Sequence, residues 1–188
     1  MEREFKEISR VLKEAKRRGY IQDFALTGAL ALSALTQPRA TKDIDFIVDL
    51  EKDRMPFFIE WLRTSKEYSF VKHHIGRRQD RIKDLIEVRL GSTWVDIIIS
   101  THQIEKDAAA TGIPISIYKS LKIKVVRPEY LLLLKLFAGS DQDFIDGAHL
   151  WNEGIDRDFV KGKAEELHLS GKLKKLEGIA RRIHAKKQ

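Results

Sequence analysis

The chain has 188 residues, which is enough for one well-buried core or for a small catalytic domain with a helical appendage. With 43% hydrophobic and 34% charged residues, its composition is that of a globular protein somewhat rich in charge. The absence of cysteine excludes disulfides and thiolate metal sites and suits a reducing compartment, so we expect a cytoplasmic protein. The sequence shows neither a signal peptide nor a long apolar run, and we expect no membrane association.

The formal net charge of +7 is unevenly spread along the chain. Residues 172 to 188 carry seven lysines and arginines against the single acidic residue Glu177. Nucleic-acid phosphates are the obvious counter-surface for such a segment, which makes RNA a candidate partner. The alternative is a solvated helical face without a partner.

The spacing of apolar residues predicts a first half that mixes helices and strands. In chain order we expect a helix over 2–18, a strand over 20–26, a helix over 28–35, a strand around 44–48, a helix over 52–67, a flexible basic loop over 72–83 and a hairpin of 82–90 with 93–99. A short helix over 105–110 and a strand over 121–126 follow.

Sheet-forming residues give way to helix formers near residue 127. Helices are expected over 129–138, 141–151, 157–169 and 172–185. The predicted fold class is therefore α+β, with a mixed sheet and flanking helices in a catalytic domain over 1–127 and a helical bundle or appendage over 128–188.

Three aspartates lie on short β-forming segments. Asp43 and Asp45 are separated by one apolar residue, so strand alternation puts both carboxylates on one face. Two carboxylates so near each other repel unless a cation lies between them. The expected cation is Mg²⁺ or Mn²⁺. Asp96 lies in a second apolar strand, where an unpaired aspartate is expensive. If the two strands are neighbours, all three carboxylates converge.

A glycine turn and a basic loop precede the first pair of aspartates. An apolar run ends at Thr27 and Gly28, and helix formers begin at Ala29, an arrangement typical of an anion site. Gly28 allows the backbone to approach bound phosphates closely. Arg39 and Lys42 are placed to neutralise a triphosphate. The alternative is that these two cations pair with nearby acids.

Together, Thr27-Gly28-Ala29, Arg39-x-Thr41, Asp43-x-Asp45 and Asp96 resemble the nucleotidyltransferase superfamily of the DNA polymerase β type, and look most like its AbiEii-type branch. A second block, from Arg127 to Gly139 and on to Asp146, resembles the same branch. The two blocks cover about residues 22 to 150. Two positions depart from the pattern: Ala29 stands where serine or glycine is usual, and Ser140 stands near the place of an arginine.

The resemblance implies a nucleotidyltransferase-type fold and transfer of a nucleoside monophosphate from a nucleoside triphosphate (NTP), ATP included, to an acceptor hydroxyl. The acceptor would be an RNA end, a protein or a small molecule. Two metal ions, Mg²⁺ or Mn²⁺, would be held by the carboxylates, and Asp96 would also draw off the acceptor's proton. The nucleotide would be contacted by Thr27, Gly28, Ala29, Arg39, Lys42 and Lys135. The same resemblance implies a toxin paired with an antitoxin protein.

Lys135 lies within an apolar run, where an unpaired ammonium is costly. The resemblance implies that it faces the cleft and touches phosphate. The alternative is a lysine whose stem packs while its head reaches water. Asp143 and Asp146 share a helix face and are candidates to pair with Lys135 or Arg39.

Other functions fit part of the pattern. A protein of the same fold that binds nucleotide or RNA without catalysis is one alternative, and a metal-dependent phosphodiesterase with water as nucleophile is another. A third is purely structural, with each aspartate pairing locally. The structural alternative leaves three acids on apolar strands to be explained separately.

Overall fold

The computed structural model describes residues 1–36, 40–65, 68–76, 84–118 and 121–185. These residues form two compact units. Unit 1 comprises Met1–Ala31 and Arg39–Val126, and unit 2 comprises Leu32–Pro38 and Arg127–Gln188. Helix α2 (Gly28–Leu35) is divided between the two units.

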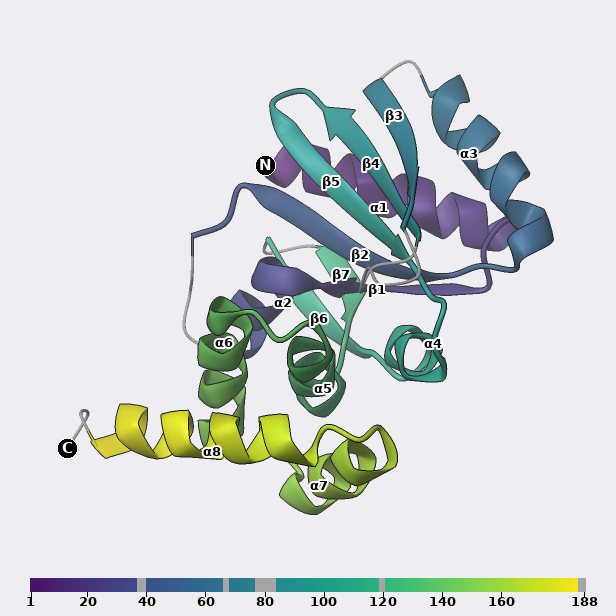
Figure 1. The fold of residues 1–188 in the computed structure, drawn as a ribbon. Helices are drawn as coiled ribbons and strands as arrows, with labels where there is room; N and C mark the ends of the chain where they lie inside the picture. Colours follow the sequence, from purple (N-terminus) through teal and green to yellow (C-terminus); the bar gives the residue numbers. More distant parts are fainter. Residues whose placement is uncertain (37–39, 66–67, 77–83, 119–120, 186–188) are drawn as a thin grey trace. The chain divides into compact units, whose positions relative to one another are not determined.

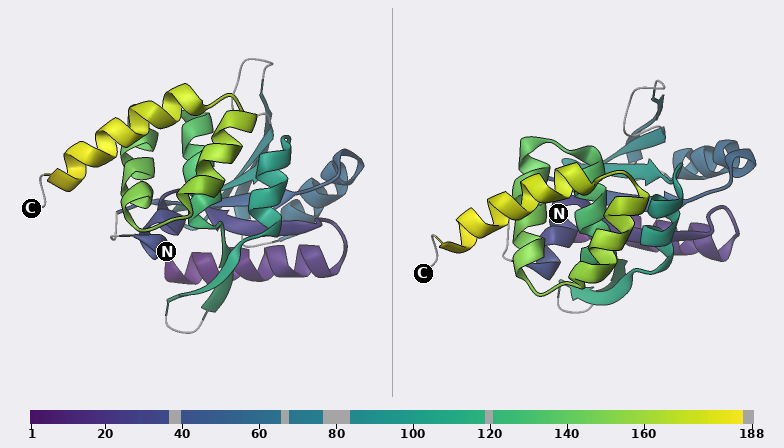
Figure 2. Two further views of the ribbon diagram at one scale, coloured as in Figure 1. Left: turned by 90° about the horizontal axis from the view of Figure 1, so that it is seen from below. Right: turned by 60° about the horizontal axis from the view of Figure 1, so that its bottom comes forward.

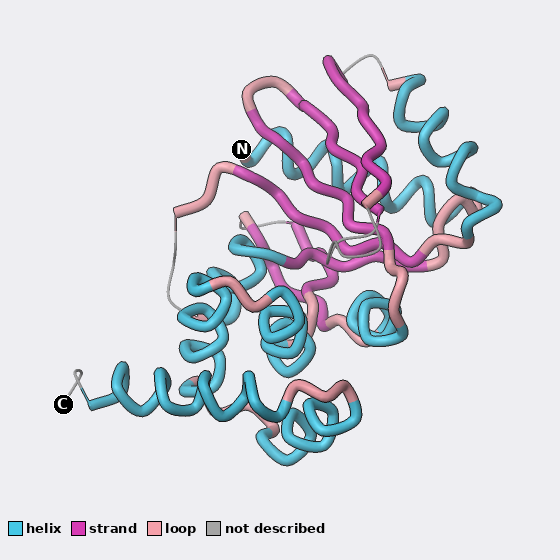
Figure 3. Tube along the Cα trace, in the orientation of Figure 1, coloured by secondary structure: helices cyan, strands magenta, loops and turns pink. Residues whose placement is uncertain are grey.

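Within the described residues, unit 1 contains a seven-stranded sheet in the order β3-β4-β5-β2-β1-β7-β6 (Figures 1 and 3). The strands are β1 (Asp23–Thr27), β2 (Asp43–Asp49), β3 (Tyr68–Ile75), β4 (Asp84–Leu90), β5 (Thr93–Ile99), β6 (Ile113–Ile117) and β7 (Leu121–Val125). Strand β2 pairs antiparallel with β1 and parallel with β5, and β1 pairs parallel with β7. The sheet is mixed, which confirms the predicted fold class.

Helices α1 (Glu2–Arg17) and α4 (Gln103–Ala110) lie on opposite faces of this sheet (Figure 2, left). Helix α1 buries one apolar stripe, and its Phe5 ring lies 6.1 Å from the ring of Phe46 on β2. Burying a large apolar side chain contributes roughly 1.5–3 kcal/mol. Because side chains alternate along a strand, the residues on either side of Phe46 point to the other face.

Helix α3 (Met55–Thr64) follows a short 3₁₀ segment, η1 (Lys52–Arg54), and is shorter than predicted. It buries Phe58 and Leu62. Its Trp61 is covered by the guanidinium of Arg18, 4.6 Å from the ring centre, and by Tyr20 at 5.7 Å. These contacts join α3 to the end of α1 and its following turn.

Two strands were not predicted. Residues 72 to 75 lie in β3, so the flexible loop predicted over 72–83 is wrong for that part, and residues 77–83 lie outside the described residues. Histidines and a lysine conceal this strand, because their charge resembles that of a surface loop. Strand β6 contains Pro114 and pairs only with β7 among the described strands. An edge position tolerates a proline, which cannot donate to the ladder.

Unit 2 is a helical bundle of α5 (Pro128–Ala138), α6 (Asp141–Asn152), α7 (Arg157–Glu166) and α8 (Ser170–Ala185), as predicted. Helix α6 packs against α5 and α8, and α7 packs against α5 and α8. A Cβ at Gly147 would lie 2.5 Å from Leu176, so glycine is what allows α6 and α8 to approach. Gly139 ends α5 in a left-handed conformation with φ of 72°.

Among the described residues, no helix combines the length and the apolar character needed to cross a bilayer.

Candidate active site

A row of polar residues crosses four strands on the face of the sheet opposite α1. Asp45 on β2 pairs in register with Asp96 on β5 and with Thr27 on β1. Asp96 pairs in turn with Glu87 on β4. Partners in register share a face, and neighbouring strands lie about 4.8 Å apart. The strand pairing therefore places three carboxylates and a threonine side by side.

Asp43 lies one step along β2 on the same face and is exposed, whereas Asp45 and Asp96 are half-buried. Its partner in register on β5 is Trp94. Asp43 and Asp45 thus lie on β2, and Asp96 lies on the neighbouring strand β5. The predicted metal site required these two strands to be neighbours.

The Asp45 side chain fills the space that a side chain at position 28 would need. A Cβ added at Gly28 would lie 2.0 Å from Oδ2 of Asp45 and 2.8 Å from its Cβ. Gly28 also has φ of +65°, a left-handed conformation that side chains disfavour. The turn between β1 and α2 therefore requires glycine for two reasons, and one of them is direct contact with a predicted metal ligand.

The pKa of Asp96 is raised. Burial is the largest cause, and repulsion from Glu87 and then Asp43 adds to it, while His74 acts in the opposite direction. A half-buried carboxylate among like charges gains from a cation or a proton. The chemistry of the site thus favours a positive partner at Asp96.

Glu87 is a fourth acid on this face that the sequence analysis missed. Its Oε2 is in contact with Nε2 of His74 on β3. The signal was present, because the predicted hairpin turns at Gly91 and Ser92. Counting outward from that turn pairs 90 with 93 and 87 with 96, which the observed register matches.

Carboxylate oxygens are the donors that Mg²⁺ and Mn²⁺ prefer, so the donor set on this face fits a divalent ion. As the side chains stand, no three histidine, aspartate or glutamate side chains within the described part of the chain converge on one point as a metal site. The strands supply adjacent ligand positions, and repulsion between the carboxylates opposes their convergence.

Most residues predicted to contact the nucleotide lie beside this row. Thr27 is buried at the end of β1, and Gly28 and Ala29 begin α2. Lys42 is exposed directly before Asp43. The Thr41 hydroxyl donates to the Asp43 carbonyl oxygen over 3.2 Å, which fixes the entry to β2. Arg39 lies outside the described residues.

Lys135, in unit 2, has acidic partners on the neighbouring helix. Its Nζ lies 2.9 Å from Oδ1 of Asp143 and 2.9 Å from Oδ2 of Asp146. Burial lowers the pKa of Lys135, but the bonds to Asp146 and Asp143 outweigh it, and the pKa is raised. Asp143 also accepts from the backbone N–H of Ser140 at the start of α6. These ion pairs join α5 to α6 and neutralise the charge of the Lys135 ammonium within an apolar helix.

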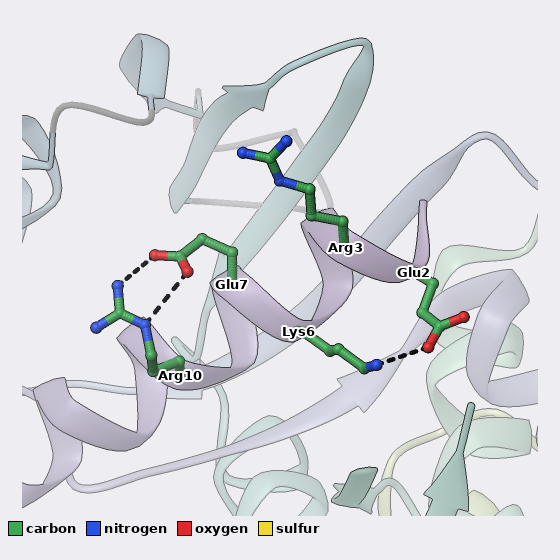
Figure 4. Close-up of a pocket in the computed structure, with 5 residues that line it drawn as sticks. All are labelled: Glu2, Arg3, Lys6, Glu7 and Arg10. Atoms are coloured by element: carbon green, nitrogen blue, oxygen red, sulfur yellow. Dashed lines mark hydrogen bonds and ion pairs between the residues drawn. The ribbon is translucent and has the colours of Figure 1, made fainter. Parts of the chain in front are cut away.

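A hollow on the outer face of α1 contains none of the predicted site residues. Its lining residues are Glu2, Arg3, Lys6, Glu7 and Arg10 (Figure 4). The ammonium of Lys6 lies 2.7 Å from Glu2, and Arg10 pairs with Glu7. These ion pairs within one helix are typical of a solvated face.

Residues 10–183 match the family described as "Nucleotidyl transferase AbiEii toxin, Type IV TA system". No curated protein matches the chain. Among solved structures, the antibiotic-resistance factor ANT(2'')-Ia is similar at 13% identity and a TM-score of 0.49, over 95% of each chain. The lincosamide antibiotic adenylyltransferase LnuA is similar at 18% identity and a TM-score of 0.45, over 79% of this chain and 97% of that one. A cytoplasmic RNA terminal U-transferase is similar at 16% identity and a TM-score of 0.37, over 79% of this chain and 38% of its own.

We expect Gly28→Ala to lower the free energy of unfolding by about 2–4 kcal/mol, because it combines left-handed strain with overlap against Asp45. Gly19 has a similar φ of +73° and nothing within 4 Å of an added Cβ, so Gly19→Ala isolates the strain, at about 1 kcal/mol. Urea denaturation of both variants measures the difference. Equal losses in the two variants would show that Asp45 does not occupy the space beside Gly28.

We expect Lys135→Met to destabilise the protein by about 3–5 kcal/mol, because it leaves two carboxylates without their buried cation. Lys163→Met removes an ion pair with Glu166 at the surface and is the matched control, with a loss below about 1 kcal/mol. Urea denaturation at neutral pH measures both losses.

The same cluster predicts a pH dependence. Hydrogen bonds from Ser140 and Lys135 outweigh burial, which alone raises the pKa of Asp143, and hold that pKa below 3.8. The stability that Asp143 contributes is therefore complete above pH 3.8 and is lost as the pH falls through the folded-state pKa. Wild type should lose more stability than Lys135→Met in that range, and parallel losses would contradict the pairing.

Proposed function

Because the chain belongs to the AbiEii family of nucleotidyltransferase toxins, we propose that it transfers a nucleoside monophosphate from an NTP to an acceptor hydroxyl with Asp43, Asp45 and Asp96 as its catalytic acids. The observation that supports these assignments is the row of Thr27, Asp45 and Asp96 across adjacent strands. Residues 1–127 are the proposed catalytic domain, and 128–188 the helical appendage. The proposed compartment is the cytoplasm, and the family's toxin–antitoxin system implies an antitoxin partner.

Nucleotidyltransferases of this kind generally use a divalent metal. We assign Mg²⁺ or Mn²⁺ to Asp43, Asp45 and Asp96, where it supplies charge neutralisation for the phosphates when bound. The raised pKa of Asp96 supports this assignment, because like charges beside it are the condition that a cation relieves.

The nucleotide is proposed to bind at the β1 side of the acids. The backbone N–H groups at the start of α2, where Gly28 and Ala29 stand, face the side on which an anion would bind, and Lys42 adds a cation beside Asp43. Arg39 and Lys135 are the further phosphate contacts that we propose. Lys135 is held by Asp143 and Asp146, so a phosphate would compete with these carboxylates.

The reaction is proposed to be an in-line substitution at the α-phosphorus. The acceptor oxygen forms a bond to the α-phosphorus, and the bond from that phosphorus to the bridging oxygen breaks, which releases pyrophosphate. Asp96 takes the proton of the acceptor hydroxyl. A carboxylate with a raised pKa is a better base than an ordinary one, which supports this role.

We expect labelled NTP, incubated with purified protein, a divalent metal and cellular RNA, to leave label on RNA or on the protein itself. In Asp43→Asn/Asp45→Asn the label should fall by at least about 100-fold, because several kcal/mol of charge stabilisation are lost. Asp53→Asn is the control, since it removes an exposed carboxylate from η1. Label that persists in the double variant would reject these acids. Bound nucleotide without any transfer would favour the nucleotide-binding module.

A measurement without catalysis tests the metal assignment. The folded-state pKa of Asp96 lies above its unfolded value, so its ionisation opposes folding, and stability from this group falls as pH rises above 3.8. At pH 7 in EDTA, Asp96→Asn should therefore stabilise the protein by about 0.5–2 kcal/mol. Added Mg²⁺ or Mn²⁺ should stabilise wild type more than the variant. Equal shifts in melting temperature for both proteins would remove Asp96 from the metal site.

A further inference from the structure

Three large side chains lie beside the acids on the same face of the sheet. Trp94 on β5 is paired in register with Asp43 on one side and with Arg89 on the other. Arg89 is paired with Phe70 on β3. The row that runs through Asp43 therefore continues as Trp94, Arg89 and Phe70 across β5, β4 and β3, whose order can be followed in Figure 1.

These three side chains contact one another and remain open to solvent. The rings of Phe70 and Trp94 are 5.6 Å apart at 84°, and the guanidinium of Arg89 lies 5.4 Å from the Trp94 ring centre. Phe70 is 38% exposed and Trp94 is 37% exposed. Large apolar side chains grouped on an exposed sheet face mark a binding surface more often than isolated ones do.

The position of this group relative to the acids divides the site into two sides. Thr27 and Gly28 lie on the β1 side of Asp45, where we place the phosphates of the NTP. Trp94 lies on the opposite side of β2, one strand spacing, about 4.8 Å, from Asp43. A group that reacts with the α-phosphate must approach the acids from a side that the NTP does not fill.

We propose that Trp94, Arg89 and Phe70, the aromatic platform, stack the bases at the single-stranded end of an RNA acceptor. This inference rests on the proposed function and specifies the acceptor class. Exposed aromatic residues on a sheet stack two or three bases in other RNA-binding folds, and arginine planes stack bases as well. A base on Trp94 holds the ribose of its own nucleotide next to Asp43.

Two exposed cations beside the rings provide contacts for the phosphates of a polyanion. Arg89 and Lys72 share this face with the platform and with the four acids of the site, and the chain as a whole carries a net charge of +7. Cations beside exposed rings fit a nucleic-acid strand, because its phosphates bind the cations while its bases stack. Cross-strand packing alone explains why the rings of Phe70 and Trp94 touch. It does not explain why both rings are exposed to solvent beside the acids.

The test measures the affinity of a short single-stranded oligoribonucleotide, labelled at its 5′ end, by fluorescence anisotropy without NTP. Trp94→Leu should weaken binding about 5- to 150-fold, the change expected for one lost stacked base. Trp94→Phe retains a ring and should restore affinity to within about threefold. Phe57→Leu is the matched control, because Phe57 is 58% exposed on α3, and it should leave affinity unchanged.

Two comparisons separate stacking from general effects. A blunt duplex of the same sequence should bind more weakly than the single strand and should respond little to Trp94→Leu, since its bases are already stacked. NTP affinity and melting temperature should be similar in wild type and Trp94→Leu. The inference is overturned if Trp94→Leu binds the single strand as wild type does, or if it weakens NTP and RNA binding equally.

The binding test and the transfer test fail independently. RNA binding that depends on Trp94, in a protein that transfers no label, rejects the proposed transfer and supports the platform. Label that enters a protein acceptor at the same rate in wild type and Trp94→Leu supports transfer and overturns the platform.

Discussion

The alternation of β2 is the constraint on which the site depends. Ile44, Phe46 and Val48 are fully buried, and Phe46 packs against α1, so this strand cannot turn its other face inward. A register slip of one residue would put Asp43 and Asp45 beneath α1 and expose the apolar set. Burial of the apolar residues of β2 therefore determines the face of the sheet on which the carboxylates lie.

The same division organises the neighbouring strands. Val95 and Ile97 on β5 continue the buried layer, while Trp94 and Asp96 continue the polar one. On β4 the buried residues are Ile86, Val88 and Leu90, and Glu87 lies between the first two. The face toward α1 thus carries the apolar residues named above, whereas the opposite face buries Ile47 and also collects the acids. Repulsion on the polar face, visible in the raised pKa of Asp96, is the cost of keeping acids together without a cation.

Local patterns predicted much of the fold. The amphipathic spacing of α1, the helical bundle after residue 127 and the β4–β5 hairpin are all visible in the sequence, because each depends on near neighbours. Strand β3 was not predicted, because the lysine and histidines at 72–74 hide its period of two, although β3 pairs with the next strand along the chain, β4. Strand order was equally inaccessible, since the parallel pairing of β2 with β5 joins residues about fifty positions apart. Propensity within a short window carries no information about such pairing.

The residues of the candidate site could be named from the sequence alone, and their roles stay a prediction. Asp43, Asp45 and Asp96 stand out because acids on apolar strands need an explanation, and Gly28 because a turn joins a strand to a helix. The overlap of Gly28 with Asp45 depends on side-chain positions across two strands, which no local pattern contains. The same holds for the contact of Glu87 with His74 and for the grouping of Phe70 with Trp94.

The two-residue turn at Gly91 and Ser92 sets more than the shape of a hairpin. It joins Leu90 to Thr93 and so decides which residues of β4 face the acids. One residue added there would shift the pairing by a step, so that Asp96 would no longer stand opposite Glu87. The length of this surface turn thus determines how many carboxylates lie next to one another in the site. Two chains with the same acids but turns of different length would differ in how much a bound cation stabilises the site.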